Sequence, residues 1–231
     1  MRWLGALLLI LLSAPAHGAE IADLELALAV DASGSVDNDE YRLQLAGIAA
    51  GFRDKAVKEA IGSGPLKRIA VSVIIWAEPQ VPKDTTGWVI VSSAAEADAF
   101  AATVEAMDRH MNGATGIGEG VSWSLRSMEE NAITATRGVV DVSGDGRETP
   151  PREFVVMMPQ ARSMARVRGV TINGLAIANE DPSVGKWYED NVITGPGAFV
   201  MQVAKYEDFA EAMRRKLIRE IDFQPRLSQR D

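Results

Sequence analysis

Five residues with oxygen-bearing side chains stand at three separate places in the chain and could together bind a metal ion. Asp31, Ser33 and Ser35 alternate within DASGS (31–35), directly after an apolar run. Thr115 and Asp145 belong to two later stretches that contain glycine, NGATGIGEG and SGDG. Because the set offers only oxygen, it suits a hard divalent cation, most of all Mg²⁺, with Mn²⁺ and Ca²⁺ as alternatives. The two carboxylates would balance the charge of such an ion, and the neutral hydroxyls would leave it attractive to one more anionic oxygen.

The surrounding sequence predicts the elements that must position these residues. Apolar runs of strand length alternate along the chain with stretches of helical spacing. The expected strands are 24–30, 68–77, 88–91, 169–177 and 197–203, together with a strand that gives way to a loop within 137–146. The expected helices are 39–58, 94–107, 117–131, 152–168 and 206–221. This alternation predicts an α/β fold with a Rossmann-like, doubly wound, mostly parallel central sheet and helices on both faces. Since ligands bind such sheets beyond the carboxyl ends of the strands, the three polar stretches should converge on one crevice.

These residues also resemble a known pattern in their types and their order. Asp31-Ala-Ser33-Gly-Ser35, then Thr115-Gly116, then Asp145-Gly146 is similar to the metal-ion-dependent adhesion site (MIDAS) of the von Willebrand factor A (VWA) domain. That site is written Asp-x-Ser-x-Ser, then Thr, then Asp. Gly144 departs from the pattern, because the family often has Thr at this position. DASGS alone would also fit capping and turn residues, and Thr115 alone would fit an N-cap of the helix that follows it.

The resemblance covers residues 22–221 and implies the VWA fold. It also implies that Asp31, Ser33, Ser35, Thr115 and Asp145 bind a divalent metal ion. In that family an acidic side chain of a protein partner often completes the metal shell. The sequence VSGDG and the N-terminal segment look most like those of an exported, single-domain bacterial group of unknown function. Resemblance to that group implies no particular partner or process.

The N-terminal segment has the layout of a secretory signal peptide. Arg2 precedes an unbroken apolar run from Leu4 to Leu12, and Ala16-His17-Gly18 offers a small-x-small cleavage site. We therefore expect a signal peptide at 1–18, a VWA-like domain at 22–221 and a C-terminal tail at 222–231. The protein should be exported to the periplasm of a Gram-negative bacterium, or secreted.

Composition excludes several classes of function. The net charge of −8 and the absence of a basic run argue against nucleic acid as a partner and against anionic lipid. No further apolar stretch approaches the length of a membrane span, so no membrane insertion is expected after cleavage. The chain has no cysteine, which excludes disulfides and zinc–thiolate sites. The oligomeric state does not follow from the sequence.

The sequence favours a binding module over an enzyme. A serine nucleophile needs a base, and His110 is the only histidine beyond the expected cleavage site. Neither Ser33 nor Ser35 stands in a Gly-x-Ser-x-Gly elbow. We therefore expect metal-dependent recognition of an acidic group on a protein. The alternatives are a metal-dependent hydrolase of esters or phosphoesters and a structural scaffold stiffened by its ion.

Three weaker candidates remain. Asp37 and Asp39 could form a second cation site, but an acidic helix start explains them more simply. Asp141 lies in the middle of an expected strand, where it could hydrogen-bond within the site or face solvent. Trp187 and Tyr188 could edge a binding surface, although a packed loop explains them better.

Overall fold

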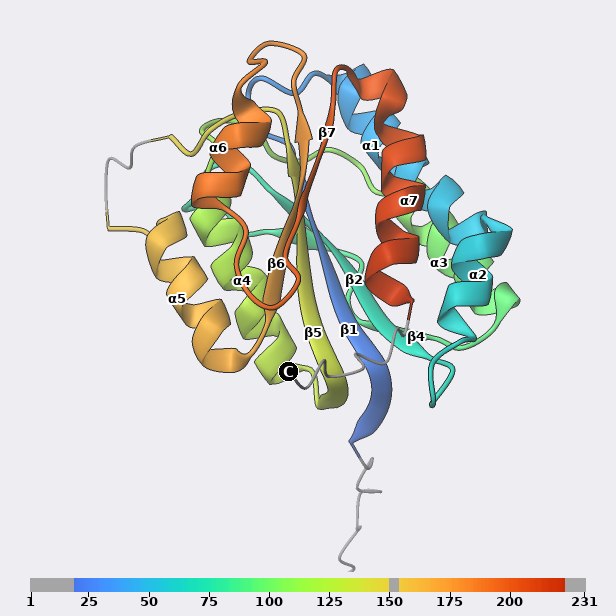
Figure 1. Cartoon of the computed structure of the whole chain (residues 1–231). Coiled ribbons are helices and arrows are strands. Elements are labelled where there is room, and N and C mark those ends of the chain that lie inside the picture. The colour runs from blue at the N-terminus through green and yellow to red at the C-terminus, as the bar shows by residue number, and fades with distance from the viewer. Residues whose placement is uncertain (1–18, 150–153, 223–231) are drawn as a thin grey trace, which may run out of the picture.

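A single mixed sheet forms the centre of the molecule in the computed structural model, which describes residues 19–149 and 154–222 (Figure 1). The strands are β1 (Glu20–Asp31), β2 (Ile69–Trp76), β3 (Asp84–Thr85), β4 (Val89–Val91), β5 (Ile133–Gly144), β6 (Thr171–Ile177) and β7 (Val200–Val203). They lie in the order β3-β2-β1-β5-β6-β7, and β4 pairs with β2 as well. The neighbouring strands in the stretch β2-β1-β5-β6-β7 all pair in parallel. The short strands β3 and β4 both run antiparallel to β2. The predicted α/β, Rossmann-like, mostly parallel sheet is confirmed.

Helices cover both faces of this sheet (Figure 1). One layer contains α1 (Asn38–Arg53), α2 (Lys55–Ile61), α3 (Ala94–Glu105) and α7 (Phe209–Ile221). The other contains α4 (Ile117–Glu130), α5 (Met158–Arg168) and α6 (Val184–Asn191). Each layer encloses its own apolar core, and the strands contribute to both cores.

Strand β1 shows how the two cores are built. Leu26 and Leu28 belong to the core under α1 and α7, whereas Ala27 and Ala29 belong to the core under α4 and α6. Side chains of a strand alternate between its faces, so a strand buried on both sides must be apolar at nearly every position. Asp31 continues the register of Ala27 and Ala29, and it therefore ends the strand on the side of α4 and α6.

Several element boundaries differ from the sequence prediction. The helix expected over 39–58 is two helices, because the Asp54 side chain accepts hydrogen bonds from the backbone N–H groups of Ala56 and Val57 and starts α2. Helix α5 begins at Met158, with Pro159 in its first turn, rather than at 152. Helix α6 and the two-residue strand β3 were not predicted.

The expected signal peptide at 1–18 and nearly all of the expected tail at 222–231 lie outside the described residues. The expected domain limits therefore stay a prediction, although β1 already begins at Glu20. Within residues 19–149 and 154–222, no helix combines the length and the apolar character needed to cross a membrane.

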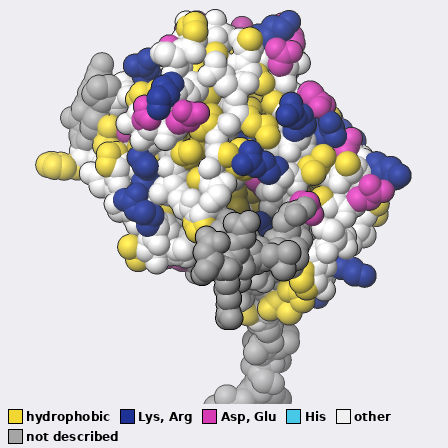
Figure 2. Space-filling view, in the orientation of Figure 1, with side chains coloured by type: hydrophobic (Ala, Val, Ile, Leu, Met, Phe, Trp, Pro, Cys, Tyr) yellow, Lys and Arg dark blue, Asp and Glu magenta, His cyan; other side chains and the backbone are white. Residues whose placement is uncertain are grey.

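Basic and acidic side chains are interspersed on the face seen in Figure 1, where neither sign forms a continuous patch (Figure 2). A surface of this kind gives no sign of a polyanion-binding site on that face.

Candidate functional site

The DASGS loop leaves the sheet at the point where the strand order reverses. Its strand, β1, lies between β2 and β5, so the loops on its two sides lead to opposite faces of the sheet. Asp31 is fully buried, and its Oδ1 accepts a hydrogen bond from the backbone N–H of Ser33 at 2.7 Å. Ser33 is also buried, whereas Ser35 is exposed. The loop thus brings one carboxylate and two hydroxyls to the carboxyl end of the sheet, the place of the predicted crevice, where open α/β sheets bind ligands.

Asp145 reaches the same crevice from the end of β5. The hydroxyl of Ser35 donates a hydrogen bond to Asp145 Oδ1 at 2.7 Å, across 110 positions of sequence. The hydroxyls of Ser33 and Ser35 are 3.4 Å apart. The structure therefore brings together the two carboxylates and both serines that the sequence analysis singled out.

Thr115 lies beside this cluster, on the loop before α4. Its hydroxyl would be 3.7 Å from a Cβ placed on Gly146, so it borders the Asp145 loop directly. Two hydrogen bonds also join Thr115 to Thr149: the Thr115 N–H donates to the Thr149 hydroxyl at 3.2 Å, and the Thr149 N–H donates to the Thr115 carbonyl at 3.0 Å. The N-cap of α4 is Gly116, and the side chain that accepts from a first-turn N–H of this helix, that of Gly118 at 2.7 Å, is the carboxylate of Glu148. The alternative role of Thr115 as a helix cap is therefore wrong.

The electrostatics of the cluster favour a bound cation. Burial, and after it the negative charge of Asp145, raise the pKa of the Asp31 carboxyl to about 7. Asp31 Oδ2 and Asp145 Oδ2 are buried and have no hydrogen-bond partner among the described residues. Leaving a buried carboxylate oxygen without a partner costs free energy, which a cation beside both oxygens would recover.

The donor set fits a hard cation rather than a soft one. Within the described parts of the chain, no group of three or more His, Cys, Asp or Glu side chains could hold a metal ion. A cation in this crevice would therefore depend on hydroxyl oxygens in addition to the two carboxylates, which suits Mg²⁺ and similar ions.

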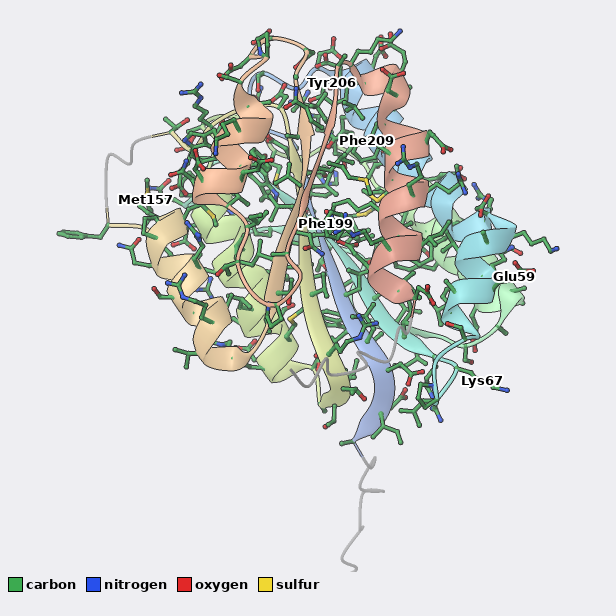
Figure 3. All side chains as sticks on the ribbon, viewed as in Figure 1. Glu59, Lys67, Met157, Phe199, Tyr206 and Phe209 are labelled. Carbon is green, nitrogen blue, oxygen red and sulfur yellow. The ribbon has the colours of Figure 1, made fainter. Side chains whose placement is uncertain are left out.

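Two buried tyrosines line the crevice, and the sequence analysis assigned neither to the site. Tyr188 of α6 is fully buried, which makes its proposed place at the edge of a binding surface wrong, and it lies on a helix rather than a loop. Tyr206 lies just before α7, at the end of the sheet where α1 also begins (Figure 3). Burial raises the pKa of both hydroxyls, and the negative charges of Asp31 and Asp145 raise it further. Nothing in the local sequence marks either tyrosine as a neighbour of DASGS.

Two further side chains hold the DASGS loop in place. The amide of Gln44, buried on α1, donates to the Asp31 carbonyl at 3.0 Å. The guanidinium of Arg109 donates to the carbonyls of Ala32 and Ser33 at 3.2 and 3.1 Å. The signal for Gln44 was a polar residue within the apolar stripe of its helix, whereas Arg109 stands in a loop and gave no signal.

The other sequence candidates have structural roles. Asp37 caps α1 by accepting from the N–H groups of Asp39 and Glu40, while Glu40 accepts from the Asp37 N–H, a capping box. Asp141 neither enters the site nor faces solvent, so both alternatives offered for it were wrong. It is buried, and its Oδ1 is 2.6 Å from Nζ of Lys216 on α7.

Solved structures with the same fold share little sequence with this chain. The proximal thread matrix protein 1 (PTMP1) of the mussel byssus matches with a TM-score of 0.56 and 15% identity, over 88% of this chain and 47% of that one. The pilus adhesin SpaC of Lactobacillus rhamnosus GG matches with a TM-score of 0.62 and 10% identity, over 88% and 31%. The chain thus spans less than half of PTMP1 and about a third of SpaC.

A third match is covered over nearly its whole length. The vWF domain of the type V pili tip protein Mfa5 from Porphyromonas gingivalis matches with a TM-score of 0.57 and 11% identity, over 88% of this chain and 98% of that one. Another structure of PTMP1 has a zinc-occupied MIDAS motif (TM-score 0.52, 16% identity, over 87% of this chain and 46% of that one). None of the curated proteins matches the chain.

The predicted VWA fold is therefore confirmed. One family model also matches, over residues 20–225, and its description is "Protein of unknown function (DUF1194)". Because this match spans most of the sequence, the chain belongs to the DUF1194 family, and its fold is that of a VWA domain.

Proposed function

We propose that this protein is an exported binding module that uses a divalent metal ion to recognise an acidic group on a protein partner. The observation that carries the proposal is the convergence of two carboxylates and two serine hydroxyls on one crevice, with two buried carboxylate oxygens left unpartnered. Thr115 borders the same crevice. The residues that would hold the ion are Asp31, Ser33, Ser35, Thr115 and Asp145.

Charge balance explains why an acidic partner suits this site. Once bound, the ion supplies an electrophilic position for an anionic oxygen. Asp31 and Asp145 contribute two negative charges, while the hydroxyls of Ser33, Ser35 and Thr115 contribute none. These two negative charges balance the charge of a divalent ion and do not exceed it, so a carboxylate of the partner would not be repelled by excess negative charge at the site. Mg²⁺ is the ion we propose, with Mn²⁺ and Ca²⁺ as alternatives.

The surroundings of the serines favour recognition over turnover. The His110 ring is largely exposed, and its Nδ1 lies 3.1 Å from Asp84 Oδ2. Among the described residues, no hydrogen bond joins His110 to Ser33 or Ser35, so these hydroxyls have no histidine base. A panel of esters and phosphoesters tests this point, since metal-dependent turnover that disappears in Asp31→Asn would favour the hydrolase instead.

The proteins with the same fold support a role outside the cytoplasm. They include a pilus adhesin, a pili tip protein and a byssus matrix protein, and the last has been solved with zinc in its MIDAS. Together with the expected signal peptide at 1–18, they support export to the periplasm of a Gram-negative bacterium or beyond. N-terminal sequencing of the exported protein should start at Ala19 or Glu20, whereas Met1 at that terminus would contradict the proposal.

Calorimetric titration of Mg²⁺ tests the metal site. Asp31→Asn should abolish binding, because it removes one of two carboxylates from a buried site. Asp23→Asn is the matched control. Asp23 is a buried aspartate at the opposite end of β1, and it accepts hydrogen bonds from the Leu66 N–H at 3.0 Å. Equal affinities for the wild type and Asp31→Asn would refute the metal site.

Capture of the partner tests the recognition step. Crosslinking in periplasmic extract, with Mg²⁺ or with EDTA, should enrich a protein only when the ion is present. Thr115→Ala should then weaken partner binding more than thermal stability, because a hydroxyl on a loop adds little to packing. Thr103→Ala, on the exposed side of α3, serves as the control. A scaffold stiffened by its ion gives the reverse, with lower stability and unchanged partner binding.

A further inference from the structure

The space above Gly144 connects the candidate metal site to helix α6. Gly144 is the last residue of β5, and it stands where the VWA pattern often has Thr. A Cβ on Gly144 would lie 2.7 Å from Asp31 Oδ2 and 2.8 Å from the hydroxyl of Tyr188. Both contacts are too short for a real Cβ, so the two oxygens fill the space that any larger residue would need.

A second glycine lets the tyrosine reach this position. A Cβ on Gly174 of β6 would lie 2.8 Å from Cδ1 of the Tyr188 ring. Gly174 pairs with Val142, two residues before Gly144 on the neighbouring strand. The ring therefore lies across both strands, against one glycine of each, and its hydroxyl extends to the buried end of β1.

The two oxygens at this point are chemically complementary. Tyr188 and Asp31 are both fully buried, and neither the Tyr188 hydroxyl nor Asp31 Oδ2 has any hydrogen-bond partner among the described residues, although both lie beside the same point above Gly144. One is a donor and the other is a carboxylate acceptor. We propose that Tyr188 is a positioning residue of the metal site: a small rotation of either side chain lets its hydroxyl donate to Asp31 Oδ2, and this bond then fixes the orientation of that carboxylate.

This inference deepens the proposed function and rests on it. A side chain that orients a metal ligand typically changes metal affinity by 10–100-fold when it is removed. Here the orienting hydroxyl comes from α6, more than 40 positions after Gly144, instead of from the strand residue itself. On this interpretation the site requires Gly at position 144, because a side chain there would displace the Tyr188 hydroxyl.

The first test measures Mg²⁺ affinity in Tyr188→Phe. This change removes the hydroxyl and keeps the ring, so we expect affinity to fall about tenfold. Tyr41→Phe is the matched control, because Tyr41 is also buried and its hydroxyl donates to the Asp108 carbonyl at 3.2 Å. The metal-free thermal midpoints of the two variants should change by similar amounts, which separates positioning of Asp31 from a general loss of packing.

The second test uses the metal-free protein and needs no ion. Gly144→Ala should lower the thermal midpoint more in the wild type than in Tyr188→Phe, because the phenylalanine background lacks one of the two clashing oxygens. If Gly144→Ala lowers the thermal midpoint equally in both backgrounds, the Tyr188 hydroxyl does not lie beside position 144, and the inference is overturned. This double-mutant comparison also applies if Tyr188→Phe is less stable than expected.

The outcomes separate this inference from the proposed function. If the wild type and Tyr41→Phe bind Mg²⁺ and Tyr188→Phe binds it equally well, the positioning role is overturned while the metal site stands. If the wild type binds no divalent ion, the proposed function and the inference fail together. A tenfold loss confined to Tyr188→Phe, with the expected coupling to Gly144→Ala, supports the inference.

Discussion

Lys216 on α7 is a fully buried cation, and its removal should sharply destabilise the fold. Its Nζ lies 2.6 Å from Asp141 Oδ1 on β5 and 2.7 Å from Glu220 Oε1 one helical turn away. All three side chains are buried. Glu220 Oε1 also accepts from the amide of Asn173 on β6 at 2.7 Å. The cluster thus joins α7 to two neighbouring strands.

The expected cost of Lys216→Met follows from this geometry. Methionine has a similar length, so the change removes the charge and leaves little cavity. Burial, and after it the charge of Asp141, raise the pKa of Glu220 to about 8, so near neutral pH Glu220 can hold a proton. In the variant, the buried side chain of Asp141 loses its contact with Lys216 Nζ. Removing one partner of a buried ion pair costs about 3–5 kcal/mol. For a domain of this size that corresponds to a fall of roughly 6–20 °C in thermal midpoint.

Urea denaturation followed by circular dichroism measures this cost. Arg214→Met is the control on the same helix, because Arg214 pairs with Glu211 at 2.7 Å where both side chains are partly exposed. We expect the control to lose less than about 1 kcal/mol. Adding Asp141→Asn to Lys216→Met should recover part of the loss, since it removes the unpaired charge. Equal, small losses for Lys216→Met and Arg214→Met would refute the reasoning.

Three more predictions concern buried or partly buried charges. Between pH 4.5, the ordinary pKa of a glutamate, and about 8, Glu220 holds a proton in the folded state but not in the unfolded state, so stability should fall as pH rises through this range. Thermal melts of the wild type and of Glu220→Gln over this pH range check the prediction. The variant should lack the part of the pH dependence that comes from Glu220. Asp145→Asn should slightly raise the thermal midpoint of the metal-free protein by removing the repulsion with Asp31, and a clear fall in that midpoint would contradict it. Arg109→Met should speed amide exchange across residues 31–36 by removing the donors that hold the loop carbonyls, and the exposed residue Arg42, changed in the same way, should leave those rates unchanged.

The sequence was a good guide to the fold and to the positions of the site loops because both depend on local patterns. An apolar run long enough to be a buried strand predicts β1, and DASGS must then lie at its carboxyl end. The same reasoning applies to Asp145 after β5. Parallel strands place these ends at one edge of the sheet, so a long separation in sequence becomes a hydrogen bond from Ser35 to Asp145.

The cluster around Lys216 was not predictable in the same way. Lys216 and Glu220 are one helical turn apart in α7, a spacing that is common on solvated helix faces. Their burial depends on Asp141, 75 positions earlier, which meets them only once β5 lies under α7. The available signal was Asp141, a charged residue in a strand of a sheet predicted to be covered on both faces. Such a residue needs a buried partner, but the sequence pattern does not identify which residue that partner is.

The end of β5 shows most clearly how a motif and a site differ. A motif compares residues at fixed positions along the chain, so Gly144 counts as a missing hydroxyl. A site requires atoms at a point in space, and the Tyr188 hydroxyl lies 2.8 Å from the point that a side chain at 144 would occupy. Tyr188 fits this space because Gly144 and Gly174, on adjacent strands, leave room for its side chain. It also depends on the position of α6, a helix that the sequence pattern did not predict. For this reason a departure from a motif is best tested by asking which atom fills the place of the missing one, and here that atom belongs to α6.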